Sequence, residues 1–188
     1  MENELFNFIS KYIKLTEEER KVITDLAIFR TYKKGTVLLK EGDLSNDGYF
    51  VIKGCIRTYH VIDGEEKITA FYTESESCTP LCSVNKKPSE YYVSCVEDSI
   101  LSVGNSEKET DLFEKFPRFE TVCRLVSEEL LVKNQATFDD FKTSTPEQRY
   151  LNLLNTRPDL IQRVPQYQIA SYLGMKPQSL SRIRKRIK

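Results

Sequence analysis

The stretch QYQIASYLGMKPQSLSRIRK, residues 166–185, has the pattern of two short helices joined by a tight turn. Gly174 stands at the turn, where a left-handed backbone is needed, and Pro177 suits the first position of the second helix. Ala170 is small enough for two helices to cross closely. We therefore predict a helix-turn-helix whose inner, apolar face is made by Ile169, Leu173, Met175, Leu180 and Ile183.

The second helix of this motif turns polar side chains outward. Gln178 can form a bidentate hydrogen-bond pair with adenine, and Arg182 can do the same with guanine. The other basic residues of the motif suit contacts with phosphates, which add affinity without reading sequence. We predict a DNA-binding surface made of Gln178, Ser179, Ser181, Arg182, Lys185, Gln166, Lys176 and Arg184. The alternative interpretation is a plain helical hairpin with a solvated basic face.

Charge separates this end of the chain from the rest. The 188 residues hold 28 basic and 28 acidic side chains, and this neutral total would speak against nucleic acid. Residues 142–188, however, hold 10 basic and 2 acidic side chains, whereas residues 1–141 hold 18 and 26, so the net charges are +8 and −8. A compact basic segment is typical of a protein that binds a polyanion. The asymmetry predicts separate domains with separate partners.

A long helix is predicted upstream of the basic segment. Residues 111–141 contain no glycine and a single proline, Pro117, near the start, where the helix would break. The apolar stripe of this helix could pack on its own domain or pair with a second copy, although Lys133 interrupts it. We predict a homodimer that forms through Phe119, Val122, Val126 and Leu130.

Three other helix starts carry capping-box spacing, in which a hydroxyl residue precedes Glu or Gln by three positions. Pro146 adds to one of them, because proline suits the first helical position. The three boxes are Thr16–Glu19, Ser106–Glu109 and Thr145–Gln148.

The middle of the chain reads as β-structure. Six of the seven glycines lie between Gly35 and Gly104, and the segments between them are rich in β-branched and aromatic residues. Asp63-Gly64 indicates a two-residue type I′ hairpin. Short strands at this spacing favour an antiparallel sandwich or small barrel. The predicted strands are 36–39, 49–52, 56–62, 67–72, 91–96 and 100–103.

Several classes of protein are disfavoured by composition. No apolar run approaches the length of a membrane span, and the first residues lack the pattern of a signal peptide, so we expect a cytoplasmic protein without membrane contact. Five scattered cysteines fit reduced thiols better than disulfides. We predict no cofactor, no metal and no enzymatic activity, because one histidine and the thiols of Cys78, Cys82 and Cys95 do not make a four-ligand site.

Three stretches, in this order, resemble the Crp–Fnr superfamily of bacterial transcription regulators. They are KKGTVLLKEGD at residues 33–43, YFVIKGCIR at residues 49–57, and the 166–185 stretch. The resemblance covers nearly the whole chain and implies an α+β fold. It also implies a double-stranded β-helix (jelly-roll) effector domain resembling a cyclic nucleotide-binding domain at 1–108, a dimerisation helix at 109–141, and a winged helix-turn-helix domain at 142–188.

The sequence departs from this family in three places. Its cyclic-nucleotide members hold the phosphate with a Gly-Glu pair and a later Arg, but here Glu90 stands about where that Arg would be and would repel a phosphate. The iron–sulfur members of the family carry an N-terminal cysteine cluster, which this sequence lacks because its first cysteine is Cys55. A wing after the recognition helix is left open. We therefore predict that cyclic AMP is not the effector of a pocket made of Glu76, Glu90, Tyr91 and Tyr92.

The resemblance and the residues together predict a homodimeric, sequence-specific transcription regulator that binds double-stranded DNA. The resemblance also allows RNA polymerase and an unknown small-molecule effector as further partners. The alternative is a small-molecule or redox sensing module with weak or no DNA binding.

Overall fold

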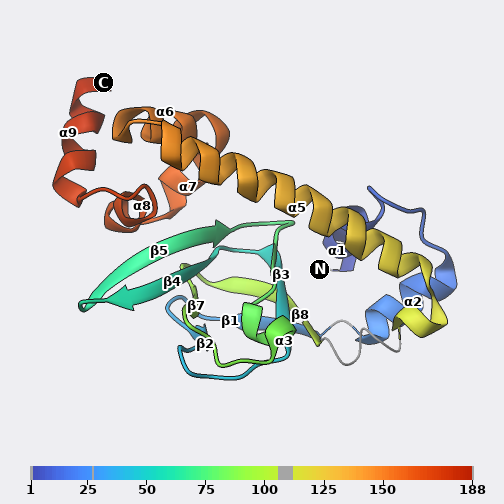
Figure 1. Cartoon of the computed structure of the whole chain (residues 1–188). Coiled ribbons are helices and arrows are strands. Elements are labelled where there is room, and N and C mark those ends of the chain that lie inside the picture. Colours follow the sequence, from blue (N-terminus) through green and yellow to red (C-terminus); the bar gives the residue numbers. More distant parts are fainter. Residues whose placement is uncertain (1, 27, 106–111, 188) are drawn as a thin grey trace. The chain divides into compact units, whose positions relative to one another are not determined.

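The computed structural model describes residues 2–26, 28–105 and 112–187 (Figure 1). The chain divides into two compact units. The first combines Met1–Thr58 with Phe71–Glu128, and the second combines Tyr59–Ala70 with Glu129–Lys188. The long helix α5, Arg118–Thr143, and two strands, β4 and β5, pass from one unit to the other. The predicted break at Pro117 is confirmed, because Pro117 separates a helical turn at residues 112–115 from α5.

The β-structure consists of two four-stranded sheets. Their strand orders are β1-β8-β3-β6 and β2-β7-β4-β5, so β5 forms an edge of the second sheet. The predicted α+β fold with a jelly-roll sandwich is confirmed. The elements are β1 (Ile28–Tyr32), β2 (Val37–Leu39), β3 (Asp47–Lys53), β4 (Ile56–Ile62), β5 (Glu65–Tyr72), β6 (Ser77–Cys78), helix α3 (Leu81–Asn85), β7 (Tyr92–Cys95) and β8 (Ser99–Asn105).

All six predicted strands are present, and the hairpin between β4 and β5 has the predicted turn. Asp63 and Gly64 both have positive φ, at 54° and 77°, as a type I′ turn requires. The sequence reading missed β1 and β6. Strand β1 pairs antiparallel with β8, from Ile28 opposite Val103 to Tyr32 opposite Ser99. Both missed strands are recognisable through partners far away in the chain rather than through their own pattern.

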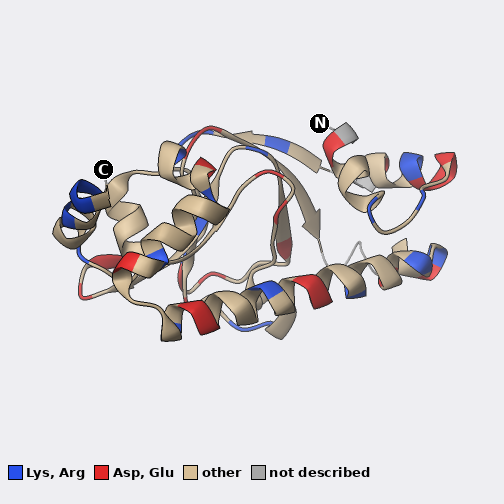
Figure 2. Ribbon diagram, turned by 90° about the horizontal axis from the view of Figure 1, so that it is seen from above, with Lys and Arg blue, Asp and Glu red and all other residues tan. Residues whose placement is uncertain are grey.

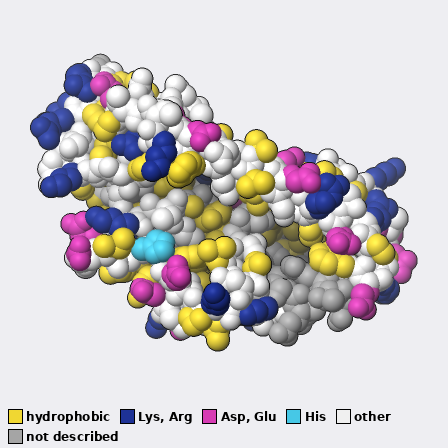
Figure 3. Space-filling view, viewed as in Figure 1, with side chains coloured by type: hydrophobic (Ala, Val, Ile, Leu, Met, Phe, Trp, Pro, Cys, Tyr) yellow, Lys and Arg dark blue, Asp and Glu magenta, His cyan; other side chains and the backbone are white. Residues whose placement is uncertain are grey.

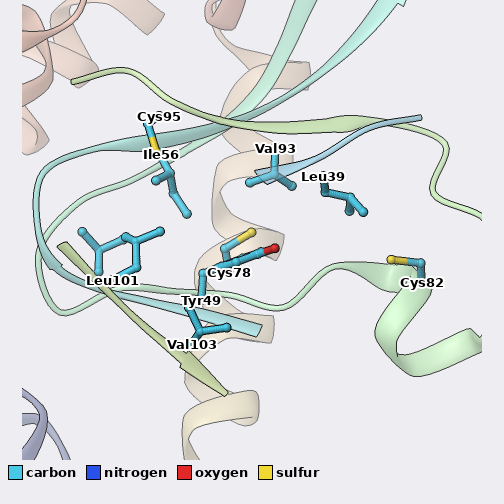
Figure 4. Close-up of a cluster of buried hydrophobic side chains, with 10 residues drawn as sticks. Leu39, Tyr49, Ile56, Cys78, Cys82, Val93, Cys95, Leu101 and Val103 are labelled. Atoms are coloured by element: carbon cyan, nitrogen blue, oxygen red, sulfur yellow. The ribbon is translucent and has the colours of Figure 1, made fainter. Parts of the chain in front are cut away.

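A cluster of buried side chains fills the interior of the sandwich (Figure 4). Ile56 and Leu101 are completely buried, and apolar residues from six different strands and α3 meet there. Tyrosines Tyr32, Tyr72 and Tyr91 pack against the cluster from its margin. The members of the cluster are Leu39, Tyr49, Val51, Ile56, Cys78, Cys82, Val93, Cys95, Leu101 and Val103.

Two N-terminal helices, α1 (Glu2–Ile9) and α2 (Glu17–Leu26), form a second cluster with the start of α5. The predicted capping box of α2 is present, because the Thr16 amide donates to Glu19 Oε2 over 2.8 Å and the Glu19 amide donates to Thr16 Oγ1 over 3.3 Å. Glu19 is buried and pairs with Arg118 Nε over 3.3 Å. The predicted box at Ser106–Glu109, together with the predicted domain boundary at residue 108, lies outside the described residues.

The part of the chain after α5 is helical. Its elements are α6 (Pro146–Thr156), α7 (Pro158–Arg163), α8 (Gln166–Tyr172) and α9 (Pro177–Ile187). The predicted capping box of α6 is complete, with Thr145 and Gln148 bonded reciprocally. Helix α7 lies where the sequence reading expected only a connection between two prolines, because Pro158 begins a short helix instead. Between residues 144 and 187 the chain forms helices and turns without a strand, so that stretch contains no β-wing.

Within the described residues, no helix combines the length and the apolar character that a membrane crossing would require.

Candidate nucleic-acid interface

Helices α8 and α9 form the predicted helix-turn-helix. Gly174 has φ of 66° at the turn, and the amide of Met175 donates to the carbonyl of Ala170 over 2.9 Å to close it. A Cβ added to Gly174 would lie 2.8 Å from Cζ of Phe141. Glycine is therefore required here twice, by the left-handed backbone and by the aromatic ring packed against it.

The inner face of the motif is buried as predicted. Ala170 is completely buried and lets the two helices approach closely, whereas Met175, also predicted on the inner face, is only half-buried. The remaining inner positions are Ile169, Leu173, Leu180 and Ile183, and each is less than a tenth exposed. This packing fixes which side of α9 is left for a partner.

The eight residues predicted to contact DNA lie on the motif with different exposure. Gln166, Lys176, Gln178, Arg182 and Lys185 are exposed, whereas Ser179, Ser181 and Arg184 are half-buried. Gln178 and Arg182 are four residues apart on α9, so both project from one side of that helix. Their role in reading bases stays a prediction.

Four of these residues meet around a shallow hollow of about 140 Å³. It is lined by Gln166, Ser181, Arg184 and Lys185. Arg184 Nη1 donates to Gln166 Oε1 over 2.8 Å, so the start of α8 is tied to the middle of α9. A guanidinium, an ammonium, a hydroxyl and an amide around one hollow are groups that suit a phosphate oxygen.

Positive charge gathers on the same motif. Residues 166–187 contain five basic side chains and no acidic one. Lys and Arg residues cluster along the ribbon of the C-terminal helix (Figure 2), and their side chains are visible over the C-terminal helices on the face shown in Figure 3. Arg186 Nη2 donates to Glu147 Oε2 of α6 over 2.5 Å, so this arginine forms an ion pair within the protein.

The residues predicted to line an effector pocket have other local roles. Glu76 Oε2 accepts a hydrogen bond from the Thr73 amide over 2.9 Å and so closes a turn. The hydroxyl oxygen of Tyr91 accepts from the Leu81 amide over 2.9 Å at the start of α3, and burial raises the pKa of Tyr91. Glu90 is exposed on a loop, and Tyr92 is half-buried. Their role in effector binding stays a prediction.

Burial keeps thiols of the sandwich interior protonated. It raises the pKa of Cys78 to about 12 and that of Cys95 to about 11. Thiols with such pKa values are poor nucleophiles and poor metal ligands at neutral pH. Within the described part of the chain, no three His, Cys, Asp or Glu side chains are grouped as a metal ion would need.

The residues predicted for the dimer helix divide into two groups. Phe119 and Val122 are buried, and Phe119 belongs to the cluster formed with the N-terminal helices of the same chain. Val126 and Leu130 are half-buried. The large apolar side chains that α5 leaves exposed are those of Leu131, Val132, Phe138 and Phe141. Which residues of α5 contact a second copy stays a prediction.

One contact of the helix-turn-helix could not be found from the sequence. Ser171 Oγ donates to the carbonyl of Glu66, and the amide of Ile68 donates to the same Oγ. Ser171 and Glu66 are about a hundred residues apart in the chain, so no local sequence pattern predicts the contact.

Comparisons with known proteins agree with this fold. Residues 29–116 match the family model of the cyclic nucleotide-binding domain. A search of the curated proteins found no match.

Solved structures similar to this chain include several regulators. A CooA mutant from Carboxydothermus hydrogenoformans is 17% identical with a TM-score of 0.68, and the match covers 91% of this chain and 80% of that one. The c-di-GMP responsive global regulator CLP from Xanthomonas campestris is 16% identical with a TM-score of 0.68, covering 89% of each chain. The Thermus thermophilus Catabolite Activator Protein is 18% identical with a TM-score of 0.57, covering 94% of this chain and 85% of that one. At such identities the likeness establishes the fold.

Proposed function

This chain has the fold of the Crp–Fnr regulators and a match to the cyclic nucleotide-binding domain, and from that premise we propose that it is a homodimeric, sequence-specific DNA-binding transcription regulator. The observation that carries the proposal is the helix-turn-helix of α8 and α9, whose inner face is buried and whose outer face is basic without a single carboxylate. Such a helix can enter the major groove with its N-terminal residues near base edges.

The roles of individual residues follow from their place on α9. Gln178 and Arg182 read bases, since both are exposed and lie one helical turn apart. The hollow of Gln166, Ser181, Arg184 and Lys185 receives a backbone phosphate. Phosphate contacts fix the register of the protein on the duplex, and base contacts then select the sequence.

A homodimer places two such readers on one approximately palindromic site, about one DNA turn or roughly 34 Å apart. Exposed apolar side chains on the second half of α5 support this assembly, because Leu131, Val132 and Phe138 are each more than half exposed. Large apolar groups gathered on one helix are typical of a surface that a partner covers.

The effector domain is proposed not to respond to cyclic AMP. Tyr91 occupies the first amide of α3 with its own hydroxyl, and side chains fill the interior of the sandwich (Figure 4). The exposed carboxylate of Glu90 opposes a phosphate in this region. The similar regulator CLP responds to c-di-GMP, so a fold of this kind can serve a ligand other than cyclic AMP. The chain would act in the cytoplasm, bind RNA polymerase when it activates, and carry out no reaction of its own.

Selection of bound fragments from random DNA, followed by a salt titration of the enriched site, tests DNA binding. We expect one enriched, approximately palindromic site and a log K that falls steeply with log salt. Lys185→Ala should weaken binding uniformly and reduce the salt slope by about 1. Lys21→Ala, which removes an exposed lysine on α2, should change neither quantity.

The absence of an enriched site together with a flat salt slope would contradict the proposal. It would favour the alternative, a sensing module with weak or no DNA binding.

Calorimetry with cyclic AMP tests the effector domain separately. We expect no heat of binding at micromolar nucleotide. Binding at that concentration would show that Tyr91 and the side chains of the interior give way to the nucleotide.

A further inference from the structure

The free edge of strand β5 contacts the helix-turn-helix. Strand β5 is the outer strand of the sheet β2-β7-β4-β5, and an edge strand presents backbone groups that no further strand satisfies. Residues Tyr59–Ala70, the hairpin made by the end of β4 and the start of β5, form one compact unit with Glu129–Lys188. Figure 1 shows this hairpin beside α8. We call Tyr59–Ala70 the hairpin segment.

A single hydroxyl group makes the contact. Ser171 Oγ of α8 donates to the Glu66 carbonyl over 2.7 Å and accepts from the Ile68 amide over 3.0 Å. In a strand, backbone groups of residues two apart point to the same side, so both partners belong to the free edge of β5. A serine hydroxyl is one donor and an acceptor, and here it satisfies one acceptor and one donor of the strand. It therefore takes the place that one residue of an additional strand would have.

This contact joins a strand and a helix that each contribute buried residues. Ile68 is only 5% exposed, and α8 has three buried residues beside Ser171. Without the hydroxyl, the amide of Ile68 and the carbonyl of Glu66 would each lose this hydrogen bond at a partly buried position, which is costly.

The hairpin segment is complementary in charge to the motif that it contacts. It contains Asp63, Glu65 and Glu66 against Lys67, a net charge of −2, whereas residues 166–187 carry +5. Lys67 bonds Glu65 and lowers its pKa, and Lys176, just before α9, lowers that pKa further through a weaker attraction. Acidic side chains of the hairpin segment thus lie within electrostatic reach of the lysine that precedes the recognition helix.

We propose that the hairpin segment is an intramolecular brake on DNA binding, latched by Ser171. The proposal rests on the proposed function, because it assigns α9 to DNA. In the latched state the carboxylates of the segment stand beside the start of α9, where they attract Lys176 and repel the phosphates of an approaching duplex. Opening the two hydrogen bonds of Ser171 removes this repulsion and frees Lys176.

Removing the latch is the direct test. In the full chain, Ser171→Ala should bind the selected DNA site roughly 3- to 10-fold more tightly, the effect expected of about one hydrogen bond. Thr156→Ala is the matched control, because Thr156 Oγ1 donates to a carbonyl of its own helix, that of Asn152, over 2.7 Å. That variant should bind like the wild type.

A second variant acts on the charge rather than on the latch. Glu65→Gln changes an exposed residue at the start of β5, so folding is preserved even if Ser171→Ala destabilises the chain. It should also tighten binding, by about 2-fold, and the gain should shrink at high salt because exposed charges are screened.

Amide hydrogen exchange at Ile68 reports the latch itself. The Ile68 amide should be protected in the free wild-type chain, exchange faster in Ser171→Ala, and exchange faster in the wild type when the selected DNA is bound. Weaker binding by Ser171→Ala, or unchanged protection of Ile68 on DNA, would overturn the brake and leave the DNA-binding proposal standing. If neither the wild type nor the two variants bind any preferred site, both proposals are wrong.

Discussion

The β-sandwich and the C-terminal helices of this protein differ in how far apart in the sequence the interactions lie that specify them. Residues 1–141 carry −8 and contain the strands, whereas residues 142–188 carry +8 and contain helices and no strand within their described part. The helices start and end at residues that can be identified locally, such as the capping box of Thr145 and Gln148. The strands find partners as far apart as β1 and β8. The comparison shows that one small chain contains helices specified by neighbouring residues and a sandwich core specified by residues distant in the sequence.

The largest effect is expected for a substitution in the core of the β-sandwich. Ile56→Ala should lower the free energy of unfolding by about 2–5 kcal/mol, because Ile56 is completely buried and the change leaves a cavity. Ile62→Ala is the matched control on the same strand, since Ile62 is 52% exposed, and it should stay within about 0.5 kcal/mol. Urea unfolding followed by fluorescence would measure both. Equal losses would show that the core of the sandwich is not where its stability lies.

The next effect concerns recognition in the helical region. Arg182→Ala should weaken binding to the selected DNA site by about 1–3 kcal/mol and relax the preference at one base position, because a bidentate contact with guanine is lost. Arg182 is exposed, so thermal unfolding should be unchanged. Competition binding with sites altered at single positions would measure the preference. A uniform loss across all sites would assign Arg182 to a phosphate instead.

Two features of the turn between α8 and α9 require glycine at position 174: its left-handed backbone and the Phe141 ring packed against it. Gly174→Ala should destabilise the protein by at least ~1–2 kcal/mol, the cost of a left-handed backbone, with an added cost from the Phe141 ring 2.8 Å from the new Cβ. Gly64→Ala has a similar positive φ but open space around the new Cβ, so it should pay only the backbone cost. Chemical unfolding measures the loss in free energy of unfolding for each variant, and the difference between the two losses is the contribution of Phe141. Equal losses would mean that the Phe141 ring moves aside at no cost.

A smaller effect tests a helix start specified by neighbouring residues. Thr145→Ala should cost about 1 kcal/mol, because the amide of Gln148 loses the side-chain oxygen that caps α6. Thr145→Ser keeps that oxygen and should restore most of the loss. Thermal unfolding of the two variants measures the cap. If serine is as damaging as alanine, the methyl group of Thr145 rather than its hydroxyl stabilises the helix start.

The smallest effect depends on pH. The hydrogen bond from Lys33 Nζ, followed by that from the Lys34 amide, holds the pKa of Asp98 below its usual range. Since the folded-state pKa is depressed, the contribution to stability is present above the ordinary pKa of an aspartate and is lost as the pH falls through the folded-state value. Asp98→Asn should therefore lower Tm slightly at pH 7, and the difference should shrink as the pH approaches 3. A difference independent of pH would show that charge is not involved.

Prediction from sequence succeeded where the signal is local. Gly174 and Pro177 correctly predicted the turn and the start of α9. Asp63-Gly64 correctly predicted the hairpin, in which both residues have positive φ. Prediction failed for β1 and β6, which pair with the sequence-distant strands β8 and β3. The assignment of a dimer surface to Phe119, Val122, Val126 and Leu130 stays a prediction; Phe119 and Val122 are buried within the single chain.

The sequence alone determined the alternation of strands and helices, the helix-turn-helix and the separation of charge, because each depends on residue type and on spacing within a few positions. The tertiary structure decided which side of α5 stays exposed and that Ser171 meets the edge of β5. Such facts depend on which distant surfaces pack together. Packing is set by the summed burial of many side chains, and no spacing within one segment encodes it.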